Sequence, residues 1–344
     1  MKTRTPRPRD RPAAIDAPAD APFCPPNARA ADPGPTARGA AAVVDAGAAE
    51  LPEHLFRRLL GAYLAGAPVF ELRQRGGLSA PNREVVRTFV RRTCGPAIVA
   101  DTGDRIVLND LPDGRPIPLE RRLGRMGQMV LDLHRDAVAS WRRLPLGAED
   151  GWERRDDAID REAWLLQRTV ARRLAAGRPD PGLLGIWTVA RSLERIADHG
   201  VVLGSVGPRL IDRPRDAAPS TSLEQFHAQA MDHLEGVLAA ADPGTANGLL
   251  DTGAALIESG RSLADRLLPG VGGATMPPAT AAAIARVVES IGRTIAYAQD
   301  IAQVVLDAPR AAPRRGSPRA GVHSPVRPRA AASPRERFLA PAVA

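Results

Sequence analysis

The chain has 344 residues, 44% of them hydrophobic and 25% charged, which is enough for one large hydrophobic core or two domains. Its formal net charge is +8, but residues 309–344 carry most of this excess, with eight arginines against a single acid, Glu336. Residues 1–50 have seven basic and six acidic side chains, so the remainder of the chain is nearly neutral. This distribution argues against a basic nucleic-acid groove on the folded part and leaves only a basic tail.

The two cysteines, Cys24 and Cys94, are too few and too far apart for a disulfide framework or a thiolate metal site. The N-terminal segment is charged and rich in proline where a signal peptide would be apolar. There is also no run of about 18 apolar residues that would cross a bilayer. We therefore expect a cytoplasmic protein with reduced cysteines and no membrane insertion.

Both ends of the chain have compositions typical of disorder. Residues 1–50 are rich in Pro, Ala, Gly and Asp with almost no large apolar side chains, and residues 309–344 repeat the pattern with arginine added. Such segments cannot bury enough apolar surface to offset the entropy of ordering. We predict a disordered N-terminal segment and a disordered basic tail that makes at most weak, nonspecific contact with nucleic acid.

The segment that follows the N-terminal region alternates helical and strand patterns. PEHLFRRLLGAYLAG and REVVRTFVRRT have helical spacing, whereas PVFELR, PAIVAD and RIVLND are typical of strands, the last two joined by a tight TGD turn. This predicts a small α/β unit. It has no glycine-rich phosphate loop and no catalytic Ser/His/Asp or Cys/His cluster.

From Pro118 onward the pattern is purely helical, with Pro and Gly at the breaks. The six predicted helices fall into two sets of three, which indicates a duplicated three-helix unit. The expected fold class is mainly α, with two three-helix bundle repeats preceded by a small α/β module. The predicted helices span 118–143, 149–176, 181–206, 221–241, 244–268 and 279–307. The predicted divisions are 1–50 (disordered), 51–115 (α/β domain), 116–208 (repeat 1), 220–308 (repeat 2) and 309–344 (basic tail).

The third of these helices places two acids beside its apolar stripe. Because successive residues rotate by about 100°, Glu194 and Asp198 fall at the margin of the buried face. Ser192, Arg195 and His199 fall on the opposite face. The sequence therefore predicts that this helix aims two carboxylates toward the interior.

The second helix shows the same arrangement. Asp156 and Asp160 lie at the margin of its apolar stripe, whereas Asp157 points to solvent. Unpaired carboxylates in such a place are costly, because desolvation and like charge both oppose ionisation. We expect a positive charge between the two pairs. Hard oxygen ligands on facing helices favour Mg, Mn, Ca or iron over copper.

Two interpretations of these acids remain open. A metal ion is one, and an ordinary ion-pair network with an arginine such as Arg155 or Arg173 is the other, since acid pairs four residues apart are common in this chain. His134, on the first helix, is either a further ligand or a buried histidine with its own hydrogen bond.

The residues that carry these acids resemble a known family. ARSLERIADH and, one helix earlier, RDDAIDR are similar to motifs of the PhoU family of phosphate-signalling regulators, and of its archaeal-type members in particular. HLFRRLLGAYLAGAPVFEL, HRDAVASW and TIAYAQDIAQVVLD extend the likeness over roughly residues 50–307. The resemblance implies two three-helix repeats with metal-binding acidic motifs, which fall here on Asp156, Asp160, Glu194 and Asp198.

The sequence departs from this family in two places. The second-repeat counterparts of Glu194 and Asp198 are Gly292 and Ala296, so we expect one metal site, in the first repeat. Archaeal-type relatives tend to carry an AbrB-like DNA-binding domain, but residues 1–50 show no paired strands or hydrophobic alternation from which to build one.

The resemblance implies a non-enzymatic, cytosolic regulator of phosphate uptake and homeostasis that acts by protein contact. Its expected partners are a phosphate ABC transporter or an associated sensor kinase, and it is expected to form a homodimer. Its expected ligand is a divalent or ferric metal ion (Mg, Mn, Fe or Zn). The alternative is a nucleic-acid-binding transcriptional regulator that uses the arginine-rich tail. A metal-dependent oxidase or hydrolase is less favoured, because the sequence lacks paired histidines and an evident pocket.

Overall fold

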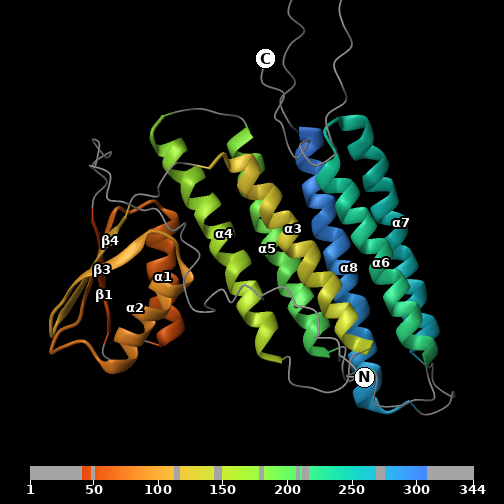
Figure 1. Cartoon of the computed structure of the whole chain (residues 1–344), viewed down its shortest axis with the longest axis horizontal. Helices are drawn as coiled ribbons and strands as arrows, with labels where there is room; N and C mark the ends of the chain where they lie inside the picture. Colours follow the sequence, from red (N-terminus) through yellow and green to blue (C-terminus); the bar gives the residue numbers. More distant parts are fainter. Residues whose placement is uncertain are drawn as a thin grey trace, which may run out of the picture.

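The computed structural model describes residues 41–47, 51–111, 117–142, 149–177, 182–206, 210, 217–268 and 276–307. Six long helices stand side by side, and a small α/β module lies next to one of them (Figure 1). The basic tail and most of residues 1–50 lie outside the described residues, so their predicted disorder stays a prediction.

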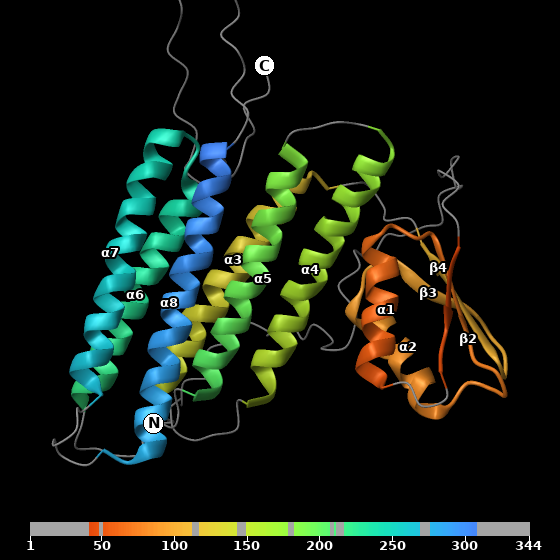
Figure 2. The ribbon, with the colours of Figure 1, turned by 180° about the vertical axis from the view of Figure 1, so that it is seen from behind.

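The α/β module is a four-stranded sheet with two helices on one face. The sheet order is β1-β2-β4-β3, with β1 parallel to β2 and the other pairs antiparallel. Figures 1 and 2 show both helices between the sheet and the long helices. The elements are β1 (Ala42–Asp45), α1 (Pro52–Leu64), β2 (Val69–Arg73), α2 (Ala80–Arg92), β3 (Pro96–Asp101) and β4 (Arg105–Asp110).

The module has its own core because its strands alternate inward and outward side chains. Phe70 and Leu72 of β2 and Leu108 of β4 are buried against Leu55 and Phe89 of the two helices. The start of α2 is set locally, since the Ser79 hydroxyl accepts a hydrogen bond from the Asn82 N–H at 3.3 Å.

Strand β1 corrects the prediction that residues 1–50 are disordered and lack a paired strand. Val43 and Val44 pair in parallel with Glu71 and Leu72 of β2, and Val44 is 5% exposed. Four residues between alanines and glycines have too little periodicity to be recognised as a strand. The hydrogen-bonding partners that specify β1 lie on the edge of β2, which is distant from β1 in the sequence.

The six long helices form two consecutive sets of three, and the predicted fold class is confirmed. The two sets stand side by side (Figure 2), and one hydrophobic core runs through both. Pro243 and the Asp242 cap, whose carboxylate accepts the Thr245 N–H at 3.0 Å, fix the start of α7. The helices are α3 (Leu119–Ala139), followed by the short 3₁₀ turn Ser140–Arg142, α4 (Glu149–Ala175), α5 (Gly182–Val206), α6 (Ala217–Ala239), α7 (Pro243–Leu267) and α8 (Pro278–Asp307).

Helix α5 is buried on two sides, which corrects its predicted outward face. It packs against α3 and α4 on one side and against α8 on the other. Ser192 is 6% exposed, and the His199 ring stacks on Tyr297 of α8 with centroids 6.0 Å apart. Only Arg195 keeps an exposed side chain as expected. A helical wheel assigns one buried face, and the second appears only when the other repeat is added.

Within the described ranges, no helix is long and apolar enough to cross a membrane.

Candidate functional site

The four predicted acids lie on two helices that pack along each other. Asp156 and Asp160 are one turn apart on α4, and Glu194 and Asp198 are one turn apart on α5. Asp160 is the most buried, at 7% exposed, and Asp156 is half-buried. The side chains of Glu194 and Asp198 are 20% and 45% exposed. The cluster therefore lies at the rim of the bundle rather than in its centre.

The carboxylates of this cluster influence one another electrostatically. Burial, and then chiefly the charge of Asp198, raises the pKa of Asp156 to about 7. Burial and the charges of Asp156 and Glu194 raise the pKa of Asp160 to about 7. The pKa of Glu194 is raised by burial and by Asp198, and that of Asp198 by burial. The two helices thus bring the four acids into one environment that is short of positive charge.

Asp156 is the least compensated member of the cluster. Its Oδ1 atom is buried and has no hydrogen-bond partner among the described residues. A buried carboxylate oxygen without a donor is costly, because it loses hydration and gains nothing in return. This oxygen is therefore left uncompensated among the described residues.

Two arginines flank the cluster, and they are not the ones considered from the sequence. Arg92, at the end of α2, donates to the Oδ2 of Asp160 at 2.9 Å and also pairs with Asp157 at 2.7 Å. Arg195 lies 3.5 Å from Glu194 and 3.7 Å from Asp198, beyond good hydrogen-bonding distance. Arg155 instead pairs with Asp136 at 2.9 Å. The ion-pair interpretation therefore describes Asp160, but within the described part of the chain it leaves the Oδ1 of Asp156 without a hydrogen bond.

The ligand chemistry of the cluster fits a hard cation, although the four carboxylates do not enclose a common point. Carboxylate oxygens from facing helices are the ligands that Mg²⁺, Mn²⁺ and Fe ions accept. Among the residues that the structure describes, no three or more His, Cys, Asp or Glu side chains are grouped closely enough to hold a metal ion as they stand. The cluster is an accumulation of negative charge rather than a closed cage.

His134 is a buried core histidine with its own hydrogen bond. It is fully buried on α3, and its Nε2 hydrogen-bonds the Ile196 carbonyl of α5 at 2.7 Å. Burial lowers its pKa to about 4, so the ring is neutral at physiological pH. This matches the second of the two interpretations made from the sequence.

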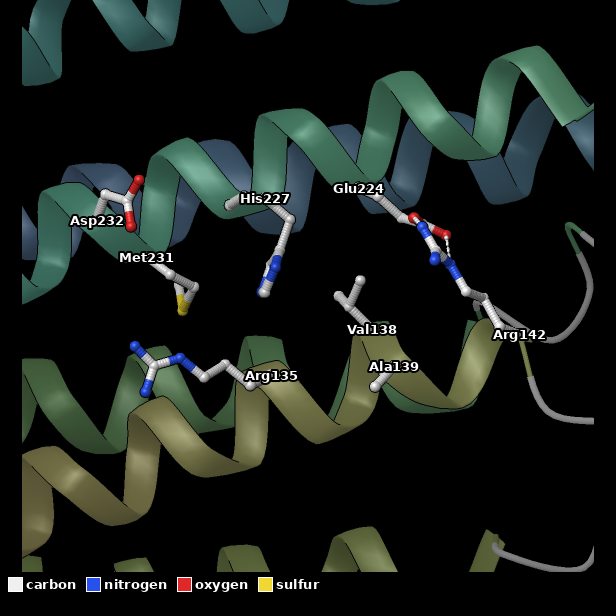
Figure 3. A pocket seen from close by; sticks show the side chains of 9 residues that line it. Arg135, Val138, Ala139, Arg142, Glu224, His227, Met231 and Asp232 are labelled. Atoms are coloured by element: carbon white, nitrogen blue, oxygen red, sulfur yellow. Dashed lines mark hydrogen bonds and ion pairs between the residues drawn. The ribbon is translucent and has the colours of Figure 1, made fainter.

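A separate groove of about 510 Å³ lies between α3 and α6, where the two repeats meet (Figure 3). Two ion pairs join the elements on its two sides: Arg142, in the 3₁₀ turn after α3, pairs with Glu224 of α6, and Arg135 of α3 pairs with Glu235 of α6. His227 lines the groove and is 4% exposed, its ring stacked on that of His134 with centroids 5.6 Å apart. Sequence reasoning missed this groove, because its residues come together only when the repeats pack.

Sequence reasoning also missed the residues that join the α/β module to α4. Trp164 of α4 packs into the core of the module, and Arg168, whose side chain is 2% exposed, donates to the Ala67 carbonyl at 2.9 Å and to the Asp110 carboxylate at 2.7 Å. These two residues are one turn apart on the face of α4 opposite its apolar stripe. A tryptophan on a polar face was the available signal, since that side chain is seldom left in water.

Residues 123–204 match the PhoU domain. This PhoU-matched segment spans nearly all of α3 through α5 and contains all four candidate acids. The α/β module and the second set of three helices lie outside the match. No curated protein matches the chain.

Proposed function

We propose that the protein is a cytosolic, non-enzymatic regulator of phosphate uptake and homeostasis that acts through protein contacts. The PhoU-matched segment supports this proposal, because PhoU domains belong to regulators of phosphate metabolism. The acidic cluster lies inside that segment, on the two helices that the resemblance singles out. The proposed partner is a phosphate ABC transporter or an associated sensor kinase, and the proposed assembly is a homodimer.

The second part of the proposal is one cation site in the first repeat. Asp156, Asp160, Glu194 and Asp198 would hold a divalent or ferric ion (Mg, Mn, Fe or Zn). The observation that carries this is the buried, unpartnered Oδ1 of Asp156 among like charges. A bound ion supplies the missing positive charge and ties α4 to α5. Binding requires the carboxylates to draw closer together than they lie here.

Equilibrium dialysis of the full chain against Mg²⁺, Mn²⁺, Fe²⁺ or Zn²⁺, with the metal measured by mass spectrometry, tests the site. We expect about one equivalent of ion on the wild type and a loss of most of it in Asp156→Asn or in the double change Glu194→Ala, Asp198→Ala. Asp132→Asn is the matched control, since Asp132 is an exposed acid of α3 that accepts a hydrogen bond from Gln128. Equal metal content in all four proteins would show that the cluster holds no ion.

The regulatory part of the proposal is tested by using the full chain as bait to capture binding proteins from cells that are replete with phosphate or starved of it. We expect mass spectrometry to identify the ATP-hydrolysing subunit of a phosphate transporter or a sensor kinase, with a yield that depends on phosphate. The proposal would be contradicted if the full chain captured the transporter subunit and the sensor kinase no better than an unrelated bait does.

A further inference from the structure

The α/β module is joined to α4 by a buried junction. Trp164 is 9% exposed and belongs to the core of the module, and Arg168 bonds the carbonyl oxygens of Tyr63 and Ala67. Arg161 of α4 donates to the carbonyl of Arg91 at 2.9 Å, at the end of α2. The last turn of α2 is therefore held in a defined place beside the acidic cluster.

Arg92 extends from this turn of α2 to the cluster. One of its terminal nitrogens lies 2.7 Å from Asp157 and 2.9 Å from Asp160. Its guanidinium carbon lies 5.4 Å from the Trp164 ring and 5.6 Å from the Phe56 ring, so aromatic faces fix the rest of the group. A planar cation restrained in this way has few alternative positions.

The module thus supplies a countercharge that the PhoU-matched segment does not. Arg92 donates to Asp160 and pairs with Asp157, whereas Arg195, on α5 itself, lies 3.5 Å from Glu194 and 3.7 Å from Asp198. Arg92 lies outside residues 123–204, and it bonds the Oδ2 of Asp160, one of the four carboxylates proposed to hold the ion. A guanidinium and a metal ion cannot both bond that oxygen along the same direction, and their like charges repel.

We propose that Arg92 is an internal competitor of the cation, so that ion binding to the cluster and docking of the end of α2 on α4 oppose each other. This inference rests on the proposed cation site. When the ion takes Asp160, Arg92 keeps only the more exposed Asp157, and the last turn of α2 is held less firmly. By thermodynamic reciprocity, firm docking of the module weakens ion binding by the same factor. The module then senses whether the cluster is occupied.

Binding of Mn²⁺ to the full chain, measured by electron paramagnetic resonance of the free ion, tests this competition. Arg92→Gln should bind Mn²⁺ about tenfold more tightly than the wild type, within the range usual for coupled sites. Arg91→Gln is the matched control, because this substitution removes the same charge from the same helical turn. Arg91 pairs with Glu84 on the exposed side of the helix. The control should bind as the wild type does.

The outcomes separate this inference from the function on which it rests. If the wild type binds Mn²⁺ and loses it in Asp156→Asn, but Arg92→Gln binds no more tightly than Arg91→Gln, the cation site stands and the competition is wrong. If no protein binds Mn²⁺ here, and none binds Mg²⁺, Fe²⁺ or Zn²⁺ in equilibrium dialysis, both the cation site and the competition are wrong. A gain in both arginine variants would indicate a general charge effect and would also overturn the competition.

Hydrogen exchange gives a second readout that does not depend on affinity. Adding Mn²⁺ to the wild type should speed amide exchange at the end of α2, over residues 89–93, and should leave the Asp156→Asn variant unchanged. Slower exchange on adding Mn²⁺ would mean that the ion strengthens docking, which is the opposite of the proposed coupling.

Discussion

Arg168→Met tests the buried junction between the α/β module and α4. Arg168 is almost fully buried and donates to the backbone carbonyls of Tyr63 and Ala67 and to the carboxylate of Asp110. Its guanidinium carbon lies 4.3 Å from the centre of the Tyr63 ring. Methionine keeps much of the side-chain volume but has no donors. The change therefore removes the charge and the hydrogen bonds while leaving the apolar contact largely in place.

The expected cost follows from what the change leaves behind. Removing one partner of a buried ion pair costs about 3–5 kcal/mol, because the other charge stays buried without compensation. Asp110 is 9% exposed, but Arg172 also bonds its Oδ2, at 2.8 Å, and offsets part of the loss. The carbonyl of Ala67 loses the side-chain donor that it has here. We expect the free energy of unfolding of the module to fall by about 3 kcal/mol.

The assay is urea unfolding of the full chain, followed by far-ultraviolet circular dichroism and tryptophan emission. Trp164 is one of four tryptophans and lies in the module core, so part of the change in emission reports on the junction. Arg172→Met is the matched control: it contacts the same oxygen, but its side chain is 44% exposed, and its loss should cost less than about 1 kcal/mol. Equal, small losses in the two variants would refute the view that Arg168 holds the module to α4.

Three further predictions concern the helices. Burial lowers the pKa of His227 from 6.5 to about 3, so the contribution of the neutral ring to stability is full above pH 6.5 and is lost as the pH drops toward 3. His227→Phe should therefore lose less stability than the wild type between pH 6 and pH 4 in urea titrations, and an equal loss would contradict this prediction. Gly204→Ala should destabilise the protein by about 1–3 kcal/mol, because a new Cβ would lie 2.7 Å from the Trp152 ring. Gly292→Ala, where the Cβ would meet open space, should instead stabilise the protein by about 1 kcal/mol. Thermal unfolding that ranks the two variants the other way would be evidence against this packing. Asp156→Asn should raise the thermal midpoint in the presence of a chelator, because it removes a negative charge that burial and the neighbouring acids destabilise. A lower midpoint would mean that this charge is already compensated.

The helices and the four acids were predictable because each depends on local periodicity. The apolar stripes of α4 and α5 run for more than five turns, and the acids sit beside them at fixed rotations. A rotation about the helix axis is known once the helix is known. The sequence therefore located Asp156, Asp160, Glu194 and Asp198 at the rim of the buried face, where the structure places them.

The partners of these acids were not predictable by the same reasoning. The sequence suggests Arg155 or Arg173 as the neutralising arginine, but Arg92, 68 residues from Asp160, is the arginine that bonds it. Strand β1 and the groove at His227 depend in the same way on elements that meet only after packing.

From the sequence alone, the protein could be described as a mainly helical chain with a duplicated three-helix unit, an α/β module and an acidic pair on each of two helices. Tertiary structure decided that α5 is buried on two sides, that the module docks on α4, and that Arg92 of the module bonds the acidic cluster. The physical reason is that helical periodicity is a property of each segment, whereas charge compensation in a folded protein depends on which segments become neighbours.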